Sequence, residues 1–347
     1  MKEYDEKFRG KNVLITGGLG FIGSNLARRL IELNPKKIAI IDSLEEGLGG
    51  DIQNVSDIYN FLDIYKINIS DTEQVYRIME EGVDYIFNLA GSIKHLDSKN
   101  RPLHDLSLNL GTHVAFLEAC GRHSRKRKNR IKILYSSTRD VYGKMKERDL
   151  PIPEDAIVTE ATDPQGIHKY ATEFHHKWFG LNFNFDTVSL RLTNTYGPWQ
   201  KTGADQGFLG YFIQKAINDE EIELWGGGKS LRDSNYIDDV VEAMLITMAS
   251  EKAKGEVYNL GNFMRRDGKF EDVGEGIRTV GESAEVITKI AESGRCKIIP
   301  YPPERKDIEP GHAYLNATKI YEHIGWEPKV SFEEGIRRTI NFYRNKN

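Results

Sequence analysis

Residues 13–23 read VLITGGLGFIG, an apolar run that leads through spaced glycines into an amphipathic stretch. We expect the run to form a strand and Phe21–Leu33 to form a helix, joined by the glycine turn. Such a turn aims free backbone N–H groups and the positive end of the helix dipole at an anion. Gly17 allows the tight turn, Gly20 leaves room for phosphates, and Gly23 lets the helix pack close to the strand. The stretch therefore predicts a pyrophosphate site.

An acidic residue follows the next β-like run. Lys37–Ile41 ends in Asp42, about 20 residues after the glycines, where a carboxylate would bind the ribose hydroxyls of a dinucleotide. A carboxylate at this point repels a 2′-phosphate, and Ser43–Glu46 offers no arginine to hold one. The two signals together predict NAD rather than NADP. The alternative, an incidental glycine turn beside a solvent-facing aspartate, leaves the order of strand, turn, helix, strand and acid unexplained.

Length and composition bound the class of protein. At 347 residues the chain can bury a large core, and we expect about two domains or lobes. A net charge of −4, with acids and bases interspersed, predicts neither a nucleic-acid partner nor attraction to a membrane. Cys120 and Cys296 lie far apart and outside any metal-ligand spacing, so we expect no metal and a reducing compartment. The charged N-terminal residues and the lack of an apolar stretch of about 18 residues predict a cytoplasmic protein.

One local exception is the basic run Arg122–Arg130. It follows an expected helix over Leu106–Cys120, whose carboxyl end its cations would complement. No aromatic or basic-face pattern accompanies the run. We therefore interpret it as a solvated connection and not as a polyanion site.

Short β-like runs alternate with helical patterns along the first half of the chain. We expect strands over Val13–Ile15, Ile38–Ile41, Ile64–Ile67, Tyr85–Leu89, Ile131–Tyr135 and Thr187–Leu190. This order predicts an α/β fold with a Rossmann-type, doubly wound parallel sheet. Ligands of such sheets lie beyond the carboxyl ends of the strands. The candidates that directly follow the runs are Asp42, Asn68, Ala90–Ser92, Ser136–Thr138 and Asn194.

The strict alternation ends after Tyr196–Pro198, and polar, Gly-rich segments such as Trp225–Lys229 intervene. We expect a smaller C-terminal α/β lobe here that binds the substrate. Tyr236–Ser250 and Glu256–Gly261 look like one more helix and strand of the main sheet. Residues 265–281 are charged and Gly-rich, and we expect a long surface loop that could act as a lid.

These patterns predict a division into two domains. The NAD-binding Rossmann domain would comprise residues 1–196 and about 234–262. The substrate-binding lobe would comprise residues 197–233 and about 263–347.

Motifs along the chain point to a known family. They are TGGLGFIG at 16–23, NLAG at 88–91, SSTRDVYG at 136–143, RLTNTYGP at 191–198 and Arg232-Asp233. With them the chain resembles the extended short-chain dehydrogenase/reductases, in particular the nucleotide-sugar epimerase/dehydratase branch near the UDP-glucose 4-epimerases. In that family a bound NAD takes a hydride from a sugar carbon, usually C4, and returns it. The resemblance also implies a homodimer formed through Leu106–Cys120 and Gly166–Gly180.

The resemblance implies catalytic residues as well. Thr138 matches the serine or threonine of the family, and Lys169 matches the lysine of its Tyr-x-x-x-Lys pair. The tyrosine position holds Gln165. A tyrosine beside an ammonium group and the nicotinamide charge has a lowered pKa and can act as a base, whereas an amide cannot ionise. Gln165 can therefore orient a hydroxyl group but cannot carry its proton.

Other groups could carry this proton. His168 lies within one helical turn of the glutamine and could titrate near neutral pH, although a packing histidine is the alternative. Lys94 and His95 follow the fourth strand, where the resemblance places sugar-contacting residues and where a plain polar loop is the alternative. Asp140 either caps a turn or matches the glutamate that moves the C5 proton in related dehydratases and decarboxylases. Arg139 stands where many 4,6-dehydratases have an aspartate, which disfavours dehydration.

The remaining site residues are implied by the same resemblance. The expected cofactor-binding residues are Gly17, Gly20, Phe21, Ile22, Gly23, Asp42, Asn68, Ile69, Ala90, Gly91, Asn109 and Lys169. The expected substrate-binding residues are Ser92, Lys94, His95, Asn194, Arg232 and Arg305. Guanidinium forks suit a pyrophosphate, and a surface ion pair is the alternative for each arginine.

The sequence thus favours an NAD-dependent nucleotide-sugar epimerase that acts at C4 of a UDP-hexose or a UDP-N-acetylhexosamine. Two alternatives stay open. One is a dehydratase or oxidoreductase that releases a keto-sugar. The other is a non-catalytic protein that binds NAD and a sugar nucleotide, because the catalytic tyrosine is absent.

Overall fold

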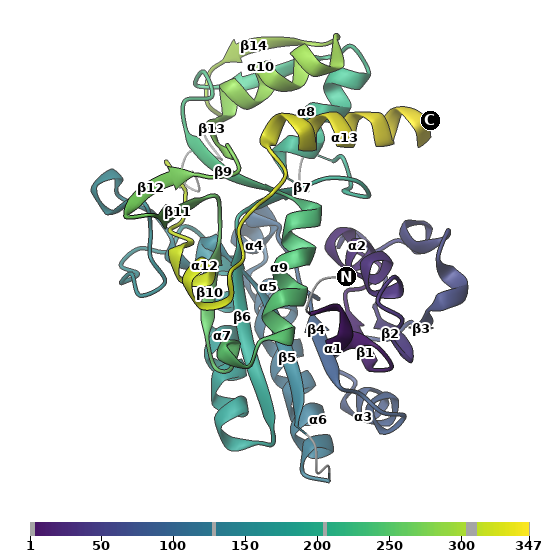
Figure 1. Ribbon diagram of the computed structural model, residues 1–347. Helices are drawn as coiled ribbons and strands as arrows, with labels where there is room; N and C mark the ends of the chain where they lie inside the picture. The colour runs from purple at the N-terminus through teal and green to yellow at the C-terminus, as the bar shows by residue number, and fades with distance from the viewer. Residues whose placement is uncertain (1–3, 127–129, 204–206, 303–310, 347) are drawn as a thin grey trace.

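Apolar runs of the chain pair into one seven-stranded sheet (Figure 1). The structure is a computed structural model that describes residues 4–126, 130–203, 207–302 and 311–346. Every pairing in this sheet is parallel, in the order β10-β6-β5-β4-β1-β2-β3. The strands are β1 (Asn12–Thr16), β2 (Lys37–Ile41), β3 (Asp63–Tyr65), β4 (Tyr85–Asn88), β5 (Ile131–Thr138), β6 (Phe185–Leu192) and β10 (Val257–Leu260). The predicted Rossmann-type sheet is confirmed.

Helices cover both faces of the sheet. One face shares a core with α2 (Phe21–Ile31) and α9 (Ile237–Ala249). The other face shares a core with α3 (Thr72–Glu80), α6 (Thr112–Ser124) and α7 (Pro164–Asn182). Burial on both faces explains why the strands read as continuous apolar runs and not as alternating patterns.

The strand order reverses between β1 and β4, which places a topological switch point there. Thr16 ends β1 and Asn88 ends β4, and the Thr16 hydroxyl donates a 2.7 Å hydrogen bond to the Asn88 side-chain carbonyl. The same hydroxyl oxygen accepts from the backbone N–H groups of Leu89 and Ala90. The two strand ends are therefore tied together at the edge where ligands of this fold bind.

A second group of elements lies at the top of the view in Figure 1, beyond the main sheet. Its strands form two small sheets, β13-β9-β7 and β14-β8. The elements are β7 (Asn194–Tyr196), α8 (Phe208–Ile217), β8 (Glu221–Trp225), β9 (Leu231–Tyr236), β13 (Ile277–Thr279), α10 (Val280–Ala291), β14 (Arg295–Ile299) and α13 (Phe332–Lys346). In the chain, α9 and β10 return to the main sheet between β9 and β13, as the patterns at Tyr236–Ser250 and Glu256–Gly261 predict. The exact division into two domains stays a prediction.

The prediction of a long surface loop at residues 265–281 is wrong. The segment contains most of an antiparallel hairpin, β11 (Phe263–Arg266) and β12 (Lys269–Asp272), and then β13. Asp267 and Gly268 form the turn, with φ of 49° and 83°. Positive φ at both central residues is typical of the type I′ turn that joins hairpin strands, and Asp-Gly is its usual sequence. That dipeptide was the signal for the hairpin.

The expected helix over Leu106–Cys120 is interrupted. A π turn, η3 (Ser107–Gly111), separates α5 (Pro102–Leu106) from α6. Other short elements are α1 (Asp5–Phe8), α4 (His95–Asn100) and α12 (Thr318–Ile324), with 3₁₀ turns η1 (Ile52–Val55), η2 (Tyr59–Phe61), η4 (Arg139–Tyr142), η5 (Glu147–Asp149) and η7 (Glu251–Ala253). Across the described ranges, no helix has the length and apolarity needed to span a lipid bilayer.

The glycine after η4 gives a first prediction. Gly143 has φ of 64°, and a Cβ built there would lie 1.7 Å from the Glu160 carbonyl oxygen. We expect Gly143→Ala to lower the free energy of unfolding by about 3 kcal/mol, because backbone strain and a clash with main chain add together. Gly268→Ala is the control: its φ is 83°, but no atom of the described residues beyond its chain neighbours lies within 4 Å of the added Cβ. The control should cost about 1 kcal/mol in urea unfolding, and equal losses in both variants would contradict the prediction.

Candidate active site

A cavity of about 830 Å³ opens at the carboxyl ends of the parallel strands. One end is lined by Gly17 and Asp42 from the first two βα connections, and the middle by Thr138 at the end of β5. The other end reaches Arg232 and Trp225 in the second group of elements. One continuous space therefore joins the glycine turn to the smaller sheets.

The glycine turn has the close contacts that its sequence predicts. A Cβ on Gly17 would lie 2.9 Å from the Ala90 backbone nitrogen, and a Cβ on Gly23 would lie 2.6 Å from the Gly17 carbonyl oxygen. Gly17 also has a left-handed φ of 66°. Gly20 precedes the first residue of α2, so the free N–H groups of that helix face the cavity end. The turn therefore fits a pyrophosphate.

Asp42 lies beside this turn. Its Oδ2 accepts a hydrogen bond from the Leu19 backbone N–H at 3.1 Å, and its Oδ1 accepts one from Leu44 at 3.0 Å. Burial raises the pKa of Asp42, and the two backbone donors oppose that rise. The carboxylate is thus fixed at the mouth of the turn, at the position that suits the ribose hydroxyls of a dinucleotide.

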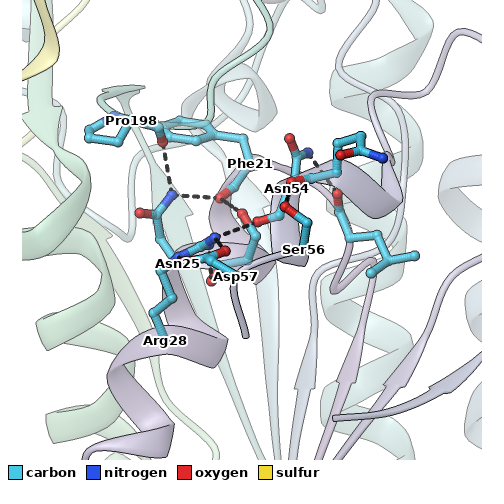
Figure 2. Close-up of polar contacts among 10 residues, drawn as sticks. Phe21, Asn25, Arg28, Asn54, Ser56, Asp57 and Pro198 are labelled. Atoms are coloured by element: carbon cyan, nitrogen blue, oxygen red, sulfur yellow. Dashed lines mark hydrogen bonds and ion pairs between the residues drawn. The ribbon is translucent and has the colours of Figure 1, made fainter. Parts of the chain in front are cut away.

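A second layer of hydrogen bonds holds the turn, as Figure 2 shows. The Asn54 side-chain amide donates to the Leu19 carbonyl oxygen at 2.9 Å, and Arg28 Nη2 donates to the Asn54 carbonyl at 2.7 Å. On the same helix, Asn25 Nδ2 donates to the Pro198 carbonyl at 3.0 Å. The helix after the glycine turn is therefore tied both to the loop after β2 and to the segment that leads away from the main sheet.

Thr138 and Asp140 form a bonded pair in the middle of the cavity. The Thr138 hydroxyl donates to Asp140 Oδ2 at 2.6 Å, and its oxygen accepts from the Asp140 backbone N–H at 3.2 Å. Burial would raise the pKa of Asp140, but Arg139, then His95 and the Thr138 hydrogen bond, lower it to about 2. The Asp140 carboxyl group is therefore ionised at neutral pH.

Lys169 lies behind this pair on α7. Its side chain is buried, and Nζ donates to the Ser136 carbonyl oxygen at 3.3 Å. Burial lowers the pKa of Lys169 to about 8, although Asp105, Asp140 and Glu173 oppose the change. A Cβ on Gly91 would lie 3.4 Å from this nitrogen. The ammonium group thus lies between the ends of β4 and β5.

Gln165 is fully buried and lines the cavity. Neither amide atom of its side chain has a hydrogen-bond partner among the described residues. Each buried polar atom without a partner costs about 1–3 kcal/mol. The next residue, Gly166, packs so closely that a Cβ would lie 2.4 Å from the Asp140 carbonyl oxygen. The amide is therefore held beside the Thr138–Asp140 pair with its hydrogen-bonding capacity unused.

The two candidate histidines differ in position. His168 Nδ1 lies 2.7 Å from Asp105 Oδ1 on α5, and His168 is not among the described residues that line the cavity. His95 does line it. Its Nδ1 lies 2.7 Å from Asp163 Oδ2, and its Nε2 lies 3.8 Å from Asp140 Oδ2. The structure therefore brings His95, and not His168, to the Thr138–Asp140 pair.

The other predicted residues are mostly brought to the same cavity. Its walls include Phe21, Ile22, Asn68, Ile69, Ala90, Gly91, Lys94, Asn194 and Arg232. Ser92 and Asn109 lie behind the wall, where Asn109 Oδ1 accepts from the Ser92 backbone N–H at 2.9 Å. Asn109 is part of the π turn, a helical irregularity that is frequent at functional sites. Arg305 lies outside the described residues.

Asp163 is a site residue that the motifs do not reveal. Its Oδ1 accepts from the Gly166 N–H at 3.1 Å and caps α7, whose first residue is Pro164. Asp before Pro at a helix start is a readable capping signal. The contact of its second oxygen with His95 depends on two segments far apart in the chain. Other lining residues outside the predicted set include Lys201, Phe208, Trp225 and Tyr301.

The fold and the cavity define a Rossmann enzyme class in which a dinucleotide turn faces a second ligand site. The chain belongs to the GDP-mannose 4,6-dehydratase family, whose model matches residues 14–339. Among curated relatives, the putative UDP-glucose 4-epimerase of Methanocaldococcus jannaschii is 27% identical over 336 residues, 96% of this chain and 99% of the relative. The dTDP-glucose 4,6-dehydratase of Salmonella typhimurium is 28% identical, and the match covers 95% of this chain and 92% of the relative.

Solved structures agree with this assignment. The UDP-glucose 4-epimerase of Thermotoga maritima, solved with UDP-glucose, is 30% identical with a TM-score of 0.82, and the match covers 96% of this chain and 99% of that one. The Thermus thermophilus UDP-glucose 4-epimerase, solved with NAD, is 26% identical with a TM-score of 0.80 and covers 97% and 100%. The predicted membership in the nucleotide-sugar epimerase/dehydratase branch is confirmed.

The unused amide of Gln165 gives a second prediction. Gln165→Met keeps the length of the side chain and removes both polar atoms, so we expect the free energy of unfolding to rise by about 1 kcal/mol. We also expect the thermal stabilisation produced by NAD to shrink, because the cavity-lining amide can no longer bond to a ligand group.

The matched control is Gln214→Met on α8, where the amide already bonds to Asn218 at 3.1 Å. It should change the unfolding free energy by less than about 0.5 kcal/mol and leave the ligand effect intact. A destabilised Gln165→Met protein, measured by urea unfolding, would show that the amide has a structural partner instead.

Proposed function

We propose that the protein is an NAD-dependent nucleotide-sugar epimerase that inverts C4 of a UDP-hexose or a UDP-N-acetylhexosamine. The observation that carries the proposal is the single cavity in which Thr138, Asp140 and Lys169 lie between the glycine turn and Arg232. A sugar whose diphosphate binds near Arg232 would have its ring beside Thr138 and the nicotinamide end of a dinucleotide. Relatives of this chain include epimerases and 4,6-dehydratases of nucleotide sugars.

The cofactor of this family is NAD, and solved epimerases and dehydratases of similar fold contain it. When bound, NAD supplies an acceptor that takes a hydride from the sugar carbon and later gives it back. The glycine turn would hold its pyrophosphate, and Asp42 would bind its ribose hydroxyls. Lys169 would lie near the nicotinamide ribose, between Gly91 and Ser136.

The remaining residues would bind and orient the sugar nucleotide. Arg232 has a guanidinium group suited to a diphosphate, and Asn194 lies at the start of β7 beside it in the cavity wall. Thr138 would hydrogen-bond the reacting hydroxyl, and Gln165 would use its free amide on the same group. Lys94, which also lines the cavity, would contact the sugar or its phosphates.

The charges favour epimerisation over dehydration. Dehydration needs an acid that protonates the departing hydroxyl group, in addition to the group that takes the C4 hydroxyl proton. Asp140 has a pKa of about 2, so its carboxyl group has no proton to donate at neutral pH. Arg139 stands beside it, with Nη1 3.3 Å from Asp140 Oδ1. An epimerase, which needs only one proton carrier, fits these groups.

The unpartnered Gln165 supports a second candidate, a protein that binds NAD and a sugar nucleotide without turnover. Its amide cannot act as the base that the family uses at this position. This candidate and the epimerase share the same cavity and ligands, and they differ only in whether a product forms.

The test is incubation of the protein with NAD and either UDP-glucose or UDP-N-acetylglucosamine, followed by mass spectrometry and proton NMR. We expect an isomeric product of unchanged mass and no net NADH at 340 nm. Lys169→Met should lower the rate by at least about 100-fold. A product lighter by one water would establish a dehydratase, net NADH an oxidoreductase, and binding without product the non-catalytic candidate.

We also propose that the protein is a homodimer. Large apolar side chains on one helix, α7, are exposed: Ile167 by 53%, Phe174 by 57%, Trp178 by 54% and Leu181 by 78%. Their spacing places them along one stripe of the helix. Leu103 of the neighbouring α5 is 81% exposed. A contiguous apolar patch of this kind is typical of a protein interface.

Trp178→Glu should convert the dimer to a monomer in sedimentation velocity, because a charge would be buried in the interface. Ile298→Glu on β14, where the native side chain is 71% exposed, is the matched control and should leave the dimer intact. A monomeric native protein, or a Trp178→Glu protein that stays dimeric, would contradict this prediction.

A further inference from the structure

We propose that His95, oriented by Asp163, carries the proton that the missing tyrosine carries in related enzymes. The inference rests on the proposed function, since it assumes that a sugar hydroxyl is oxidised beside Thr138. It names one histidine among the alternatives that the sequence leaves open, and it adds a positioning residue, Asp163, that no motif indicates. The basis is the placement of four side chains along one wall of the cavity.

Asp163 sets the orientation of the imidazole. His95 Nδ1 lies 2.7 Å from Asp163 Oδ2, so in the neutral ring Nδ1 carries the hydrogen and donates it to that carboxylate. Nε2 then has a free lone pair, and it lies 3.8 Å from Asp140 Oδ2. An orienting carboxylate on one ring nitrogen and a reactive second nitrogen is the arrangement of a general base.

Asp163 is itself fixed. The residue is buried, and its other oxygen accepts the Gly166 N–H as the cap of α7. His95 is 37% exposed, and its exposed surface faces the cavity. The carboxylate is therefore part of the rigid helix start, whereas the imidazole it orients is open to a ligand.

Two links lead from the position of the reacting hydroxyl to His95: one hydrogen bond and one approach of 3.8 Å. The Thr138 hydroxyl donates to Asp140 Oδ2 at 2.6 Å, and the same Oδ2 is the atom that faces His95 Nε2. The sugar carbon would lose its hydride to the acceptor that bound NAD would supply, and its C–O bond becomes a carbonyl. Its hydroxyl proton then passes to Thr138 Oγ1, and the Thr138 proton passes to Asp140 Oδ2. That proton moves to His95 Nε2 when the 3.8 Å separation of the two atoms closes to hydrogen-bond length. Reduction of the carbonyl from the opposite face reverses each transfer, so no proton is gained or lost.

The charges around the path decide where the proton rests. Arg139 and the other neighbours hold the pKa of Asp140 at about 2 despite its burial, so this carboxylate passes a proton on and does not keep it. Burial would lower the pKa of His95, and Arg139 also lowers it, but Asp140 and Asp163 outweigh both and raise it. The imidazolium that forms would lie between two carboxylates.

Neither Gln165 nor Lys169 is placed to carry this proton. The Gln165 amide lines the cavity but cannot ionise. Among the described residues, Lys169 Nζ donates to the Ser136 carbonyl oxygen and makes no hydrogen bond to the side chains of Thr138 or Asp140. Among the described residues of this wall, His95 is the ionisable base that approaches the Thr138–Asp140 pair, with Nε2 3.8 Å from Asp140 Oδ2.

The experiment compares variants of the full-length protein with bound NAD, using UDP-glucose and UDP-N-acetylglucosamine as probes over a range of pH. His95→Gln should lower kcat by about 100-fold or more, with a smaller change in KM. The substitution removes the imidazole that carries the proton but keeps a side chain of similar volume. Asp163→Asn keeps a capping side chain but removes the charge. It should lower the pKa of His95, so the acidic limb of the kcat profile should move down by about one pH unit.

The acidic limb moves to lower pH because His95 acts as a base. His95 must be neutral to accept a proton, so activity falls as pH drops below its pKa, and removal of a carboxylate shifts that fall to lower pH. The matched control is His104→Gln on α5. His104 Nε2 lies 3.7 Å from Glu45 Oε1, and neither residue is among the described residues lining the cavity. The rate and the pH profile of the His104→Gln protein should match those of the unaltered protein.

Each outcome separates the two proposals. If the unaltered protein converts neither probe, the proposed function fails and this role fails with it. If it converts a probe and folded His95→Gln protein keeps its kcat within about threefold, only the role of His95 fails. An unmoved acidic limb in Asp163→Asn would overturn the pairing, and NMR titration of the His95 imidazole gives the same answer without turnover.

Discussion

Glu173 and Arg191 form a buried ion pair that joins α7 to β6, and the geometry of the candidate active site depends on it. Arg191 Nη2 lies 2.7 Å from Glu173 Oε2, and both side chains are about 5% exposed or less. Arg191 Nη1 also donates to the Tyr142 hydroxyl in η4 at 2.6 Å, and the Ser137 hydroxyl of β5 donates to Glu173. Breaking such a buried pair costs about 3–5 kcal/mol, because one charge is left without its partner.

The pair matters for the site because it sets where α7 meets β5. Lys169 lies one turn before Glu173 on this helix, and Gln165 lies one turn earlier still. The first turn of α7 then packs against η4 so closely that only a glycine fits at position 166. Rigid placement of this kind explains why the Gln165 amide stays buried with no hydrogen-bond partner in the described part of the chain, since the surrounding packing does not move to supply one.

Much of the fold and of the cofactor end was readable from sequence because the contacts there are local. The glycine turn, the strand before it and Asp42 follow from short-range rules about φ, helix dipoles and strand order, and the structure agrees. Strand positions were predicted within a few residues. The hairpin at 263–272 differs from the predicted loop because its charged, Gly-rich composition is typical of loops, whereas the hairpin signal is only the turn dipeptide Asp267-Gly268.

The chain alone thus determined a doubly wound sheet, a dinucleotide turn and the presence of Gln165 where a base is expected. Tertiary structure alone decided which histidine reaches the site. His168 is closer to Gln165 in sequence, but helix geometry turns it toward Asp105, whereas His95 and Asp163 meet from segments 68 residues apart. The physical reason is that periodicity specifies which face of an element a side chain occupies, but only the packing of one element on another specifies what that face contacts.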